Sequence, residues 1–73
     1  MRPATVEYAK GWGYEVTFPG EPEPVEVTET DVESEFARRY AAEELTPPES
    51  DAAKRRIAEE IATARLAARP RRR

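Results

Sequence analysis

Carboxylates are the most abundant side chains capable of chemistry in this 73-residue sequence. Seven of the fifteen fall between residues 21 and 35: Glu21, Glu23, Glu26, Glu29, Asp31, Glu33 and Glu35. Such groups can act as general acids and bases or hold Ca²⁺ or Mg²⁺. The segment lacks the spacing of an EF-hand loop, and no nucleophile accompanies it. We therefore expect no metal, no cofactor and no enzymatic activity, and interpret the acids as solvated or as facing a basic partner.

Two chemically important residue types, His and Cys, are absent. A catalytic imidazole, a thiolate metal site and a disulfide framework are therefore excluded. No apolar run approaches the roughly 20 residues of a membrane span, and residues 1–10 lack the apolar core of a signal peptide. We expect a cytoplasmic protein without a membrane partner. Ten Arg against two Lys, with no Asn or Gln, is typical of a high-GC bacterium or its phage, although a thermophile or a design would look similar.

Basic side chains gather towards the end of the chain: Lys54, Arg55, Arg69, Arg71, Arg72 and Arg73. They form a candidate nucleic-acid-binding set, because each neutralised phosphate adds salt-dependent affinity. The alternative is a solubilising tail, or cations that complement the C-terminal end of a helix dipole. In either case we expect residues 69–73 to be a disordered basic tail.

The charges are unevenly divided along the sequence. Residues 1–37 hold nine acids and two bases, and residues 38–73 hold six acids and ten bases, within an overall net charge of −3. Such asymmetry indicates different partners for the two halves, or self-association. Simple solvation of an ordinary surface is the alternative.

Trp12 stands between two glycines at a predicted turn. Aromatic side chains often anchor interfaces, so Trp12 is a candidate contact residue. The alternative, favoured by the scarcity of large apolar residues, is that it folds into the core. We expect the partner-binding set to be Trp12, Tyr14, Glu26 and Glu29.

Predicted strands position the candidate partner-binding residues. Residues 5–18 alternate apolar and polar side chains, which predicts two half-buried strands. A hairpin loop at residues 11–13 would pair Val6 with Phe18 and place the apolar side chains on one face. After a proline-rich connection, residues 25–29 alternate again and predict a third strand.

Two helices are predicted to follow. Thr30 and Glu33 have capping-box spacing, which predicts a helix from there to about Leu45. Its apolar face would contain Val32, Phe36, Ala37, Tyr40, Ala41 and Leu45. A second capping box, Thr46 with Glu49, predicts another helix to residue 68. Its narrow stripe would contain Ile57, Ile61, Ala64 and Ala68.

The order β-β-β-α-α predicts one small α+β domain over residues 1–68, a three-stranded antiparallel meander followed by two α-helices on one sheet face. Apart from Met1, only 15 large apolar side chains are available for a core. Because no disulfide can reinforce this core, we expect a homodimer or a complex with another protein.

Residues 13–20 read Gly-Tyr-Glu-Val-Thr-Phe-Pro-Gly and are followed by a short strand, a Thr-x-x-Glu cap and an Ala-rich helix. This pattern, over residues 5–45, resembles the HicB antitoxin family, whose members carry a partial RNase H-like domain. The chain departs from the family after residue 46, where one helix and an Arg tail replace a further strand and a DNA-binding segment. The family's Leu-Pro-Gly-Cys run is also replaced by Gly-Glu-Pro-Glu-Pro.

The resemblance implies a non-enzymatic regulator that binds and masks a small basic RNA-cleaving toxin, and the acidic half of the chain suits such a partner. Two alternatives stay open. The chain is a nucleic-acid-associated protein that uses its basic C-terminal part, or a phage or host accessory protein that inhibits a host factor through its acidic face.

Overall fold

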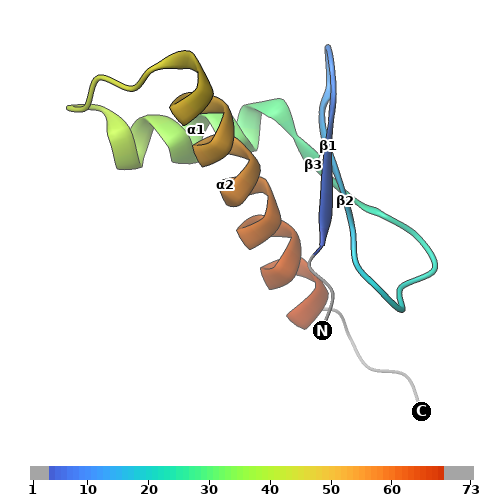
Figure 1. The fold of residues 1–73 in the computed structure, drawn as a ribbon. Helices are drawn as coiled ribbons and strands as arrows, with labels where there is room; N and C mark the ends of the chain where they lie inside the picture. The colour runs from blue at the N-terminus through green and yellow to red at the C-terminus, as the bar shows by residue number, and fades with distance from the viewer. Residues whose placement is uncertain (1–3, 69–73) are drawn as a thin grey trace.

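The computed structural model describes residues 4–68. Its elements are β1 (Thr5–Ala9), β2 (Gly13–Thr17), β3 (Val25–Thr28), α1 (Glu29–Tyr40) and α2 (Pro47–Ala67). The strands form an antiparallel sheet in the order β1-β2-β3, and both helices lie on one side of it (Figure 1). The predicted α+β fold, a meander followed by two helices, is confirmed.

The register of the hairpin differs from the predicted one. Val6 lies opposite Val16, and the loop is residues 10–12, one residue earlier than expected. The pairing of Val6 with Phe18 was therefore wrong, although the apolar side chains still share one face. The loop closes early because the amide of Trp12 donates to the carbonyl of Ala9, at 3.2 Å.

Gly13 consequently begins β2 instead of ending the loop. Its φ of +150° is unfavourable for other residues, and an added Cβ would lie 2.2 Å from the Val27 carbonyl oxygen. Only glycine therefore allows the neighbouring strand to approach this closely.

The first helix begins two residues earlier than predicted, because Thr28 and not Thr30 is its N-cap. The Thr28 hydroxyl accepts a hydrogen bond from the amide of Asp31. The Glu29 amide, which no helical carbonyl can satisfy, donates to the Trp12 carbonyl at 2.8 Å. The hairpin thus supplies the partner that lets β3 continue directly into α1.

The first helix also ends early, at Tyr40 instead of Leu45. Continuing it would place Glu43 and Glu44 in the last turn, where the negative end of the helix dipole disfavours acids. The second helix begins as predicted: Thr46 and Glu49 form the reciprocal capping box, and Pro47 opens the helix.

The core lies between the sheet and the helices. Its buried side chains are Tyr14, Val16, Val27, Val32, Ala53, Ile57, Ala58 and Ala62. The predicted face of α1 is right for Val32, Phe36 and Tyr40, whereas Ala37 and Ala41 are exposed. On α2, Ile57 is buried and Ile61 half-buried, but Ala64 and Ala68 are exposed. The buried stripe of α2 is displaced because this helix packs on both the sheet and α1.

Candidate protein-binding surface

Helix α2 crosses all three strands on the covered face of the sheet (Figure 1). Its two crossing points are marked by arginines ten residues apart, a rise of about 15 Å along a helix. Arg55 donates to the Val6 carbonyl on β1 at 2.7 Å, and Arg65 donates to the Glu26 carbonyl on β3 at 3.0 Å. Each edge strand therefore has one backbone acceptor occupied by α2, which blunts the edges as sites for strand addition.

The outer face of the sheet has a different character. The register places Glu7 directly opposite Glu15, and Glu15 directly opposite Glu26. We call this row of three side chains the glutamate ladder. Because side chains alternate along a strand, the ladder points away from the face that packs on the helices. Glu7 and Glu26 are exposed, and Glu15 is partly exposed.

No cation compensates the glutamate ladder within residues 4–68: the ion pairs of this region involve other acids. Like charges directly opposite one another destabilise a sheet by about 0.2–1 kcal/mol for each pair. The rest of this face is small or polar, with Thr5, Ala9, Thr17 and Thr28. The outer face is therefore a negatively charged surface whose charges do not serve folding.

The four predicted partner-binding residues do not share one surface. Trp12 is 38% exposed on the hairpin loop, so the alternative in which it joins the core is wrong, and its role as a contact residue stays a prediction. Tyr14 is only 3% exposed and its ring belongs to the core. Glu26 belongs to the ladder, whereas Glu29 is at the start of α1 and accepts a hydrogen bond from the Tyr8 hydroxyl at 2.8 Å.

Of the predicted nucleic-acid-binding residues, the structure describes Lys54 and Arg55. Lys54 forms an ion pair with Glu33 at 2.9 Å and lies 5.0 Å from the centre of the Phe36 ring. Arg55 is held by Asp51 and by the Val6 carbonyl. The two basic side chains are thus engaged within the domain. The remaining predicted members, Arg69, Arg71, Arg72 and Arg73, lie outside the described residues.

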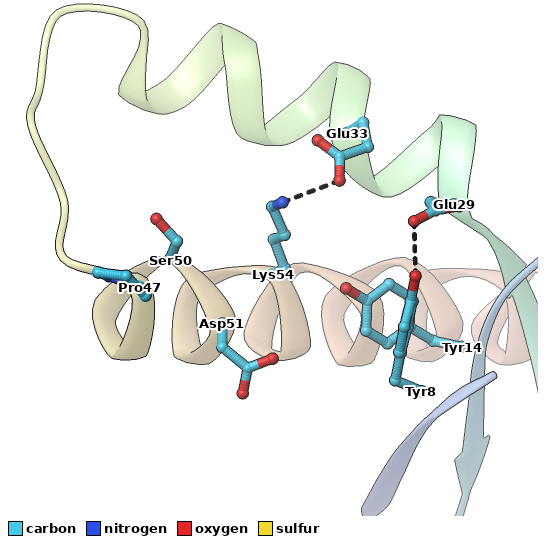
Figure 2. Close-up of a pocket in the computed structure, with 8 residues that line it drawn as sticks. All are labelled: Tyr8, Tyr14, Glu29, Glu33, Pro47, Ser50, Asp51 and Lys54. Carbon is cyan, nitrogen blue, oxygen red and sulfur yellow. Dashed lines mark hydrogen bonds and ion pairs between the residues drawn. The ribbon is translucent and has the colours of Figure 1, made fainter. Parts of the chain in front are cut away.

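A second feature is a pocket between the hairpin, α1 and α2, drawn in Figure 2. Its volume is about 330 Å³, and its lining residues are Tyr8, Tyr14, Glu29, Glu33, Pro47, Ser50, Asp51 and Lys54. The hydrogen bond to the Glu29 carboxylate raises the pKa of Tyr8, and burial raises the pKa of Tyr14. Both phenols are therefore neutral and able to donate hydrogen bonds at physiological pH.

The sequence did not lead us to predict that Glu7 and Glu15 belong to one site, and it did not predict the pocket. The predicted register would have placed Glu7 opposite Thr17, so the ladder could not be seen. The alternation of β1 and β2 did indicate that Glu7 and Glu15 share one face. The pocket had no signal, because Glu33 and Asp51 are brought together only by the packing of α1 on α2.

Among residues 4–68, no helix is long and apolar enough to cross a bilayer. No known family model, characterised protein or solved structure matches the chain.

Proposed function

We propose that the protein is a non-enzymatic regulator that binds a basic protein through the glutamate ladder. The observation that carries this proposal is the register of Glu7, Glu15 and Glu26 across the open sheet face. Three opposed acids cost stability and gain no cation from the described part of the chain, so a cationic partner would relieve their repulsion. Charge complementarity of this kind mainly sets specificity and the rate of association.

The edges of the sheet support a face-on partner. Arg55 and Arg65 each occupy a backbone acceptor of an edge strand, so addition of a partner strand is disfavoured. In the described part of the chain, by contrast, no helix covers the outer face (Figure 1). An exposed, charged surface suits a reversible protein complex.

The HicB-type pattern of residues 5–45 makes a small basic RNA-cleaving toxin the first partner to consider. A self-associated form of the domain belongs to the same proposal, since eight buried side chains, six of them Ala or Val, form a modest core. Self-association predicts a thermal midpoint that rises with protein concentration. A monomeric mass with a constant midpoint would remove this part of the proposal.

The test compares two variants with the same change in net charge. The ladder variant carries Glu7→Gln, Glu15→Gln and Glu26→Gln. The control carries Glu43→Gln, Glu44→Gln and Glu59→Gln, which lie on the loop after α1 and on α2. Proteins retained by each full-length chain, including the products of neighbouring genes, are quantified and their net charges compared.

We expect one basic protein to bind the wild type and the control variant, and to be lost from the ladder variant. With that protein purified, affinity should fall about tenfold or more in the ladder variant and should weaken as salt is raised. Equal binding to both variants, or a partner without excess positive charge, would contradict the proposal.

A further inference from the structure

The pocket of Figure 2 lies on the opposite side of the sheet from the glutamate ladder, so a ligand there is independent of the proposed function. Three separate elements form it: Tyr8 and Tyr14 come from the hairpin, Glu29 and Glu33 from α1, and the remaining residues from the first turns of α2. At about 330 Å³ it is large enough for one long side chain of a partner.

The Tyr14 hydroxyl is the first sign of a ligand. Tyr14 is 97% buried, and Figure 2 shows its hydroxyl directed into the pocket. The hydroxyl makes no hydrogen bond within residues 4–68, although Tyr8, whose ring centre is 5.1 Å away, does so. No buried side-chain polar atom of residues 4–68 lacks a partner, so the Tyr14 hydroxyl is open to the pocket and is a free hydrogen-bond donor there.

The charges of the pocket define the kind of ligand. Glu29, Glu33 and Asp51 each use one carboxylate oxygen, for Tyr8, Lys54 and Arg55 respectively. The second oxygen of each has no protein partner in the described part of the chain. Two cations, Lys54 paired with Glu33 and Arg55 paired with Asp51, offset the three carboxylates, so the pocket retains one negative charge and favours a cationic ligand.

The rings of Tyr8 and Tyr14 form an aromatic wall of the pocket, and this wall favours one kind of cation over another. Tyr8 is 42% exposed at the rim, and it packs at 51° against the ring of Tyr14. A planar guanidinium can stack on an exposed ring while its five N–H donors reach several acceptors, whereas an ammonium has three donors and no plane. Acceptors from three elements around one aromatic wall therefore match a guanidinium best.

We propose that this pocket binds an arginine side chain of a protein partner. The guanidinium lies against Tyr8 and donates to the free oxygens of Glu33 and Asp51 and to the Tyr14 hydroxyl. Because the Tyr14 hydroxyl binds only this ligand, removing the hydroxyl weakens binding without weakening the fold.

The test is a titration of the ¹⁵N-labelled full chain at low salt with the peptide acetyl-Gly-Arg-Gly-amide, followed by amide chemical shifts. Two matched peptides replace Arg by citrulline, which has a similar shape without charge, or by Lys. We expect saturable shifts centred on Tyr8, Tyr14, Glu33 and Asp51 with the Arg peptide, weaker ones with Lys and none with citrulline. No saturable shift, or equal shifts with citrulline, would overturn the proposal.

Two variants test the contacts. Tyr14→Phe should bind the Arg peptide about five- to tenfold more weakly, with an unchanged or slightly higher thermal midpoint. Asp51→Asn should weaken binding to a similar extent, and Glu15→Gln, on the opposite face, should leave it unchanged. Full affinity in both Tyr14→Phe and Asp51→Asn would overturn the assignment of the site. Loss of the glutamate-ladder interaction affects none of these results.

Discussion

The side chains on the two faces of the three-stranded sheet have opposite effects on stability. The inner face places Tyr14, Val16 and Val27 against the helices, with exposed fractions of 3% or less. The outer face places Glu7, Glu15 and Glu26 opposite one another without a compensating cation in residues 4–68. On the inner face each side chain gains stability from burial, at about 25 cal/mol for each Å² of apolar surface. On the outer face the arrangement costs stability.

The fold requires the side chains of the inner face, whereas it only tolerates those of the outer face. A sheet that only had to be soluble would mix charges of both signs across its open face. The ladder instead repeats one sign at three positions in register, while ion pairs are plentiful on the helical side, where Arg39 links Glu35 with Glu60. The comparison leads to the interpretation that the outer face is arranged for a partner.

The largest expected effect lies where the sheet meets the helices. Gly13→Ala should remove more than about 4 kcal/mol of stability, because the new Cβ would lie 2.2 Å from the Val27 carbonyl oxygen and backbone would have to move. Gly11→Ala is the matched control: φ is +99° there, but no atom lies within 4 Å of the added Cβ. It should cost about 1–2 kcal/mol. Urea unfolding measures both, and equal costs would contradict the packing at Gly13.

The next largest effect is a difference in stability between substitutions on the two faces of the sheet. Ile57→Ala should cost about 2–5 kcal/mol, because Ile57 is 1% exposed at the centre of the core. Thr17→Ala, on the outer face, should change stability by less than about 0.5 kcal/mol. Thermal or urea unfolding of the two variants tests the contrast directly. A cost above about 2 kcal/mol at Thr17 would show that the outer face also serves the fold.

Acid should weaken the helical side. Hydrogen bonds from Arg65 lower the pKa of Asp31, and those from Arg38 and Arg39 lower the pKa of Glu35. A carboxyl group with a depressed folded-state pKa stabilises the protein above its unfolded value, near 4, and this contribution is lost as the pH falls through the folded-state pKa. Unfolding free energies measured between about pH 5 and pH 2 should therefore decline. In the variant Asp31→Asn the decline should be smaller, and an identical decline would contradict the role of Asp31.

The sequence predicted the parts of the fold that depend on local chemistry. Alternation located the strands, and the pairing of Thr46 with Glu49 located the start of α2, because caps and period-two patterns act within a few residues. The start of α1 was misplaced because its first amide is satisfied by Trp12, seventeen residues away in sequence. Such long-range partners leave no local signal.

The candidate site was less predictable for the same reason. The one-residue error in the hairpin loop hid the glutamate ladder, since register decides which side chains are opposed. Composition favoured a core position for Trp12 and its place between two glycines favoured a contact; the short loop holds its backbone and leaves the side chain 38% exposed. The pocket depends on how α1 packs on α2, which periodicity does not specify.

The stability of the ladder variant shows whether the three glutamates serve the fold or a partner. Glu7→Gln, Glu15→Gln and Glu26→Gln together remove two opposed pairs of like charges and keep the shape of each side chain. We predict a free energy of unfolding in urea at pH 7 and low salt that is higher than that of the wild type, by about 0.2–1 kcal/mol for each pair. The gain should shrink when salt screens the wild-type repulsion. A clear loss of stability would contradict the account, because the ladder would then serve the fold and not a partner.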